Sequence, residues 1–250
     1  MRTIFICLFA VFVCGCANTV QVQLFSTTVG RLADDLDSFY SEVQSSREEI
    51  EIDSGIQSHV RISAILKQAH TFQKEVEQRH IAVLALRRYA IALNNLATGV
   101  ANDTGAVLEV QQAIKSGTPA ADAIDKMTAA LINADKAALL HKKITVTDSA
   151  VAGLLNVIQS DIQLEVKRAS VERVVRDTIL SDWYSKAEAR VDSAILLRQE
   201  IDAQQRDDNL DKMLPKLQKA VDACLAAHHE LTQSMPDATV IRKFASYSLE

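Results

Sequence analysis

Residues 22–43, VQLFSTTVGRLADDLDSFYSEV, place an apolar side chain at every third or fourth position without interruption. The apolar positions are Val22, Phe25, Val29, Leu32, Leu36, Phe39 and Val43. Because an α-helix repeats every ~3.6 residues, this spacing keeps all of them on one side of a helix. The stretch therefore predicts a long helix whose apolar stripe packs against a partner helix.

A second and longer series of the same kind covers residues 62–97. Its positions are Ile62, Ile65, Ala69, Phe72, Val76, Arg79, Val83, Leu86, Ala90, Leu93 and Ala97. Further apolar side chains lie off this stripe at Ile81, Leu84, Ile91 and Ala92. We therefore expect residues 81–97 to be covered on several sides and to form the centre of a helical bundle.

Arg79 is the only charged residue in that series. A guanidinium at a helix–helix contact must reach solvent along its stem or meet a carboxylate, because an unpaired buried charge costs several kcal/mol. We expect pairing with a carboxylate of another helix. The functional alternative is that Arg79 sets the register of the helices or receives an anionic ligand.

The middle of the chain contains helix-ending residues at 99–105 and a new start at Gly117-Thr118-Pro119. An alanine-rich helix is predicted over 120–138. Thr145 to Asp148 predicts another break, with Asp148 capping one long helix over 148–206. The alternative is two helices with a turn near Ala169-Ser170. The predicted core positions of this region are Leu155, Ile158, Ile162, Val166, Ala169, Val171, Val175, Ile179, Leu180, Trp183, Ala187, Ala194, Leu197 and Ile201.

The polar run at 204–209 predicts a turn, and Pro215 is expected to begin or to kink the last long helix. The predicted core face of that helix is Leu214, Leu217, Val221, Cys224, Leu225 and Leu231. A tail at 235–250 follows, with apolar residues Val240, Ile241, Phe244, Tyr247 and Leu249. We expect the tail to pack back on its own domain, the alternative being a docking peptide that uses Val240, Phe244 and Tyr247.

The composition agrees with these helical patterns. The chain of 250 residues has only 3 prolines and 7 glycines, and aromatic residues make up 5%. Such a composition favours long helices over sheet. The predicted fold is all-α: an elongated antiparallel helical bundle with long coiled-coil-like helices, five or six in number, over residues 24–234.

The N-terminus combines Arg2, an apolar run over 4–13 and the sequence Val13-Cys14-Gly15-Cys16. The apolar run is too short for a permanent membrane-spanning helix and is typical of a secretion signal. The segment resembles the class II signal peptides of bacterial lipoproteins, in which an aliphatic residue, a small residue and a lipidated cysteine occupy the places of Val13, Gly15 and Cys16. That resemblance implies cleavage of residues 1–15, lipid on Cys16 and a tether over 16–23. It places the protein in a bacterial cell envelope and, if the source is Gram-negative, at the outer membrane, because residue 17 is Ala rather than Asp.

Cysteine use agrees with a chain that forms no internal disulfide. Cys7 and Cys14 would leave with the signal and Cys16 would be alkylated, so only Cys224 remains. Cys224 lies on an apolar stripe and is expected to be a small buried hydrophobic residue.

The sequence offers little catalytic chemistry. Glu77-x-x-His80 occurs once, whereas a di-metal bundle needs two such motifs, so we expect no metal site. In His228-His229 only one imidazole falls on the apolar stripe, and we expect all the histidines to be hydrogen-bonded or solvated. The basic residues among 167–176 alternate with acidic ones and are expected to form a solvated helix face. No catalytic motif is found, so we predict neither enzyme activity nor a cofactor.

The formal net charge of −5 argues against a nucleic-acid partner, which would need a concentrated basic surface. We expect a membrane-tethered, non-enzymatic interaction or scaffold module, with an envelope protein or a second copy as its partner. The alternative is a carrier that binds a lipid or quinone in the bundle core. Its wall would comprise residues 120–138 with Phe72, Tyr89 and Trp183. An apolar internal cavity would favour the carrier, and a solid core with exposed apolar side chains would favour the scaffold.

Overall fold

Four long helices and one short one build the protein in the computed structural model, which describes residues 2–57, 62–98, 124, 126, 140–186, 190–233 and 235–247. They are α1 (Arg2–Gln57), α2 (Ile62–Thr98), α5 (Leu140–Lys186), α6 (Arg190–Leu231) and α7 (Ala238–Ala245). The described residues include no strand. The predicted all-α class is thereby confirmed. The predicted helix over 120–138 lies outside the described residues, apart from Ile124 and Lys126.

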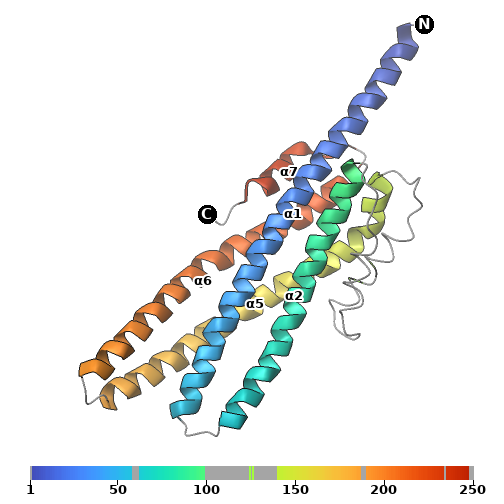
Figure 1. Cartoon of the computed structure of the whole chain (residues 1–250). Coiled ribbons are helices and arrows are strands. Elements are labelled where there is room, and N and C mark those ends of the chain that lie inside the picture. Colours follow the sequence, from blue (N-terminus) through green and yellow to red (C-terminus); the bar gives the residue numbers. More distant parts are fainter. Residues whose placement is uncertain are drawn as a thin grey trace.

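The helices form two antiparallel hairpins that pack across one another (Figure 1). The first hairpin is α1 with α2, and the second is α5 with α6. α1 contacts each of the other helices in the described part of the chain, and α7 folds back onto α1 and α6. The N-terminal part of α1 projects beyond the bundle, while the C-terminal end of α5 and the N-terminal end of α6 lie at the opposite end. Within the described residues, no helix combines the length and hydropathy needed to cross a membrane.

α1 is one continuous helix from Arg2 to Gln57. The predicted stripe is correct at all seven positions, Val22 to Val43, each of which is buried. Residues 16–23, predicted to be a tether separate from the bundle, belong to the same helix, and Val22 is already 1% exposed. A helical segment rises only ~1.5 Å per residue, so these residues reach less far than an extended tether would.

The centre of the core contains the second half of α2, as predicted. Val83, Leu86, Ala90 and Leu93 are buried against α1, although Ile91 is exposed rather than covered. From α6, the predicted positions Leu214, Leu217, Val221, Cys224 and Leu231 are also buried.

The helix boundaries between 140 and 231 differ from the prediction. α5 passes through Thr145 and Asp148 without a break, because Thr145 Oγ1 donates to the His141 carbonyl (2.9 Å) and Thr147 Oγ1 to that of Ile144 (2.9 Å). Hydroxyls that bond within a helix need not end it. The single helix predicted over 148–206 is wrong: α5 ends at Lys186 and α6 begins at Arg190. The turn predicted at 204–209 is also wrong, since α6 continues through it and through Pro215.

The prediction placed the boundary between these two helices at the wrong residues. Several predicted core positions on α5 and α6 are also exposed. These are Val166, Val171, Val175, Leu197 and Ile201. Their place in the interior is taken partly by charged residues. Glu165, Arg176 and Asp207 are all less than a tenth exposed.

The C-terminal tail packs on its own domain, as expected. Asp237 caps α7 by accepting the Thr239 amide (2.8 Å), and Ile241 and Phe244 are fully buried. The Phe244 ring lies 5.6 Å from that of Phe25 in α1. Val240 and Tyr247 are partly buried, so Phe244 anchors the tail.

Candidate functional site

An ion-pair cluster occupies the interior where α1, α2, α5 and α6 meet away from the apolar core. We define it by its residues: Arg47, Glu49, Arg79, Asp161, Glu165, Glu172, Arg173, Arg176, Arg206 and Asp207. Every helix of the two hairpins contributes to it. The cluster thus joins elements that are far apart in sequence through charge rather than through apolar packing.

Arg79 has the carboxylate partners that the sequence predicted. Its Nε lies 2.9 Å from Asp161 Oδ2 and its Nη2 donates to Glu165 Oε1 at 2.5 Å. The guanidinium carbon also lies 5.7 Å from the ring centroid of Tyr40, within cation–π range. Two carboxylates thus neutralise the guanidinium, which leaves little positive field for an anionic ligand.

Glu165 is the central acceptor of the cluster. Its Oε2 accepts from Arg47 Nη2 at 2.8 Å, and its Oε1 also accepts from Arg168 Nη1 at 3.1 Å. Arg47 makes a second bond, from Nε to Glu172 Oε1 at 2.6 Å. The prediction of a solvated face over 167–176 is therefore wrong for Arg176, and the neighbouring Glu165 is only 2% exposed.

Burial changes the proton affinity of two groups at this site. The pKa of Asp161 is raised, chiefly because burial disfavours its charged form, although Arg79 opposes the shift. Burial also holds the pKa of Tyr40 well above its usual value, with Asp161 adding to the effect. Tyr40 therefore stays protonated, and its hydroxyl donates a hydrogen bond to the Asp161 carboxylate.

A second polar cluster in the interior consists of Tyr89, His228 and Asp148, which are joined by hydrogen bonds. The Tyr89 hydroxyl lies 2.6 Å from His228 Nε2 and 2.9 Å from Thr147 Oγ1. His228 Nδ1 lies 2.8 Å from Asp148 Oδ1, and His229 Nδ1 lies 3.2 Å from Asp148 Oδ2. The order of groups resembles a catalytic relay, but Tyr89 and His228 are 1% and 0% exposed. Both side chains are thus closed off from solvent, and the hydrogen bonds connect α2, α5 and α6.

The surroundings of these hydrogen-bonded residues shift the pKa values of two of them. Burial raises the pKa of Tyr89, and hydrogen bonding from His228 lowers the pKa of Asp148. Only His228 of the His228-His229 pair faces the core, as predicted. The apolar pattern placed His228 on the core face of its helix, but nothing in the sequence indicated Tyr89 or Asp148 as its partners.

The other histidines that can be assessed are also satisfied. His80 Nδ1 lies 2.5 Å from Asp37 Oδ1, and His141 Nε2 lies 2.7 Å from the Thr232 carbonyl. The expectations for His59 and His70 fall on residues whose side chains lie outside the described part. Among the side chains that are described, no group of three or more His, Cys, Asp or Glu residues is arranged to hold a metal ion.

The two cysteines singled out by the sequence differ in what the structure says of them. Cys224 is fully buried and unpaired by disulfide, and burial raises the pKa of its thiol, in agreement with a small hydrophobic role. The side chain of Cys16 lies outside the described part, although the backbone there belongs to α1.

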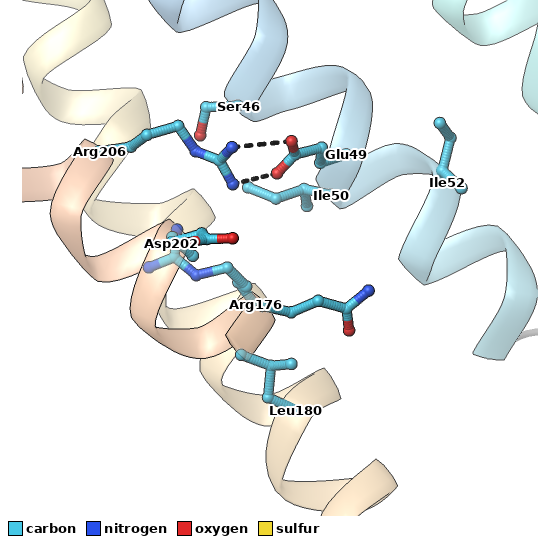
Figure 2. Close-up of a pocket in the computed structure, with 10 residues that line it drawn as sticks. Ser46, Glu49, Ile50, Ile52, Arg176, Leu180, Asp202 and Arg206 are labelled. Carbon is cyan, nitrogen blue, oxygen red and sulfur yellow. Dashed lines mark hydrogen bonds and ion pairs between the residues drawn. The ribbon is translucent and has the colours of Figure 1, made fainter. Parts of the chain in front are cut away.

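A half-open cavity of about 230 Å³ borders the ion-pair cluster between α1, α5 and α6 (Figure 2). Its lining residues are Ser46, Glu49, Ile50, Ile52, Arg176, Leu180, Gln199, Asp202, Ala203 and Arg206. At one edge, Arg206 of α6 reaches across to the carboxylate of Glu49 in α1 through both terminal nitrogens. The cavity thus has charged groups at its edge and aliphatic side chains at its base. No pattern in the sequence predicted it.

Comparison with known proteins adds no assignment. No family model, no curated protein and no solved structure matches this chain.

Proposed function

We propose that this protein is a lipid-anchored, non-enzymatic interaction module of a bacterial cell envelope, held at the membrane through Cys16. The observation that carries the proposal is the course of α1. The sequence Val13-Cys14-Gly15-Cys16 lies in the same helix as the buried stripe that begins at Val22. Lipid on Cys16 would be joined to the core through six residues, or roughly 9 Å of helix.

A lipid attached in this way would hold the bundle in a defined relation to the membrane surface. From Cys16 to Gln57, α1 extends by roughly 62 Å at ~1.5 Å per residue. The C-terminal end of α5 and the N-terminal end of α6 lie on the side away from the N-terminal end of α1 (Figure 1). An interaction module benefits from this geometry because its far end can meet a partner beyond the lipid headgroups.

The surface of the far end also supports an interaction role. Exposed apolar side chains occur on the distal parts of α5 and α6. Val171, Val174 and Val175 lie on one face of α5 and are 63%, 66% and 41% exposed. Exposed apolar side chains in contiguous groups are typical of protein–protein contact surfaces. Because they accompany a tightly paired interior, they favour the scaffold over the carrier.

The carrier hypothesis receives less support from the described residues. The cavity between α1, α5 and α6 is half-open and rimmed by charged groups, whereas a lipid or quinone needs an enclosed apolar space. Tyr89, expected in the carrier's wall, is bonded to His228 and Thr147 inside the core. Of the other residues expected in the wall, Trp183 is partly buried, while Phe72 and most of 120–138 lie outside the described side chains.

The anchoring part of the proposal is tested by labelling the full chain with radioactive palmitate in bacterial cells. We expect label on the natural chain and on Cys14→Ser, but none on Cys16→Ser. Cys14→Ser is the matched control because it changes the neighbouring cysteine and keeps Cys16. Equal labelling of Cys16→Ser and the natural chain would contradict lipid attachment at this residue.

The interaction part is tested by native mass spectrometry of the Cys16→Ser protein released from the cell envelope. A bare homo-oligomer, or a stoichiometric complex with an envelope protein, is the expected result. A monomer that retains one lipid or quinone molecule per chain would instead establish the carrier.

A further inference from the structure

The cavity between α1, α5 and α6 has an apolar base. Ile50, Leu180 and Ala203 are each less than a tenth exposed and present aliphatic carbon to it. Ile52, half exposed, lies at its mouth. A flexible hydrocarbon chain entering this cavity would lose water-exposed apolar surface on three sides, which is favourable.

One of the charged groups that line the cavity is unpaired among the described residues. Arg206 is paired with Glu49, and Arg176 is paired with Asp207. Asp202 also lines the cavity, and none of the described residues forms a hydrogen bond or ion pair with its carboxylate. Figure 2 shows Asp202 extending from α6 into the space that faces α1. Both arginines of the lining are thus paired with carboxylates, and Asp202 is the one charged lining residue that has no partner among the described residues.

An aliphatic base with one unpaired carboxylate is complementary to an aliphatic chain that ends in a cation. We propose that this cavity receives a lysine side chain of a partner protein. The methylene groups would lie along Ile50, Leu180 and Ala203, and the ammonium would meet Asp202. This inference deepens the proposed interaction function and rests on it.

Lysine fits the cavity better than arginine does. The compact ammonium on a flexible stem can approach a single carboxylate from several directions, whereas a guanidinium binds a carboxylate best in one planar geometry. Two guanidinium groups, those of Arg176 and Arg206, already occupy the walls. The Gln199 side chain, which is exposed at the same cavity, offers a neutral carbonyl oxygen as a second acceptor.

The surroundings of the cavity fit a protein rather than a small free amine. Ile195 precedes Gln199 by four residues on α6, so it lies on the same face of that helix, and it is 55% exposed. Together with Ile52 it gives apolar contact area beside the mouth for the chain that carries the lysine. A small soluble amine would leave both isoleucines exposed.

The test uses the full chain in detergent micelles, with methyl NMR signals of Ile50, Ile52 and Leu180 as reporters. The probe is Nα-acetyl-lysine N-methylamide, and the matched compound is its norleucine analogue, which keeps the stem and lacks the ammonium. We expect saturable shifts at millimolar lysine probe and at least fivefold weaker binding of the norleucine compound. Equal binding of the two compounds would overturn the proposal.

Two variants on α6 separate the role of Asp202 from a general charge effect. Asp202→Asn should weaken binding of the lysine probe at least fivefold, while Asp208→Asn, also exposed on α6, should leave it unchanged. Ala203→Leu should abolish the shifts by filling the cavity. Unfolding curves in urea check that each variant is folded. An unaltered affinity in folded Asp202→Asn would refute the assignment.

A free polyamine is the remaining source of a similar cation. If spermidine binds more than tenfold more tightly than the lysine probe, the occupant is a small amine and the partner-protein assignment falls. Neither palmitate labelling nor the native mass of the Cys16→Ser protein depends on Asp202. If the lysine probe does not bind, but palmitate labels Cys16 and the Cys16→Ser protein assembles as expected, the proposed function still holds and only the lysine assignment is refuted.

Discussion

Arg79 of α2 donates from Nη2 to Glu165 Oε1 of α5 at 2.5 Å, in a place where Glu165 is almost completely buried. The same carboxylate accepts from Arg47 of α1. One side chain of α5 therefore positions two other helices. A buried carboxylate that holds two arginines is costly to remove, because the arginines remain in the interior after it is gone.

Glu165→Gln should lower the free energy of unfolding by about 3 kcal/mol, since Arg47 and Arg79 keep only Glu172 and Asp161 as counter-charges. Urea unfolding followed by circular dichroism measures the change. Asp177→Asn makes the same change of charge on the exposed side of α5 and should cost less than ~0.5 kcal/mol. Similar losses of unfolding free energy in the two variants would show that Glu165 stabilises the fold no more than an exposed carboxylate does.

Tyr89→Phe should lower the free energy of unfolding by about 1–3 kcal/mol, because it leaves His228 Nε2 and Thr147 Oγ1 without their shared partner inside the core. Thermal and urea unfolding provide the measurement. Tyr247→Phe, which alters a partly exposed tyrosine after α7, serves as the control. A Tyr89→Phe protein as stable as this control would mean that the hydroxyl contributes nothing.

Asp148 should make the protein sensitive to acid. Its folded pKa is lower than the ordinary value of 3.8, first because His228 donates a hydrogen bond to it and also because of His229. A lowered carboxyl pKa adds stability at pH values above the unfolded pKa, and this contribution is lost as the pH falls through the folded pKa.

Comparison with Asp148→Asn isolates this contribution. The natural protein should exceed the variant in free energy of unfolding at pH 5–7, and the difference should shrink below about pH 4, where the unfolded chain binds the proton. Urea unfolding at several pH values measures it. A difference that is constant from pH 3 to 7 would be the contrary result.

Phe244→Ala should release α7 while the rest of the bundle stays folded, because Phe244 is the residue that fills the site beside Phe25. Hydrogen exchange should show at least tenfold less protection of amides in 238–245 and little change in α2 or α5. Lys243→Ala, on the exposed side of α7, should leave the protection as it is. Loss of protection throughout the chain would mean that α7 is needed for the whole bundle.

Periodicity predicted the elements whose interior contacts are apolar. All seven stripe positions of α1 are buried, as is the predicted core face of α6 apart from Leu225, which is partly buried. In these parts the hydrophobic effect alone decides which side faces inward, so a pattern of apolar residues is sufficient.

The prediction failed where charge replaces apolar side chains in the interior. After Ile162, the inward position is Glu165 rather than the apolar Val166, and the polar run at 204–209 contains the buried Asp207. A residue-type pattern treats these positions as surface. Their burial depends on arginines from other helices, such as Arg47 and Arg176, which the local sequence cannot identify.

The partners of the candidate sites were out of reach for the same reason. Arg79 was recognised as needing a carboxylate, but more than eighty residues separate it from Asp161 and Glu165. The cavity beside the ion-pair cluster is lined by residues of three helices, so predicting it requires knowing how those helices pack together.

The docking of Phe244 onto Phe25 also determines where a reporter can be attached. Phe25 lies nine helical residues from Cys16, or roughly 14 Å along α1. With lipid on Cys16, a fluorescent protein fused after α7 would therefore emerge beside the bilayer and compete with it for space. A small dye attached at the C-terminal end of α5, at the opposite end of the molecule, would leave the bilayer side free and report on partner binding at that end.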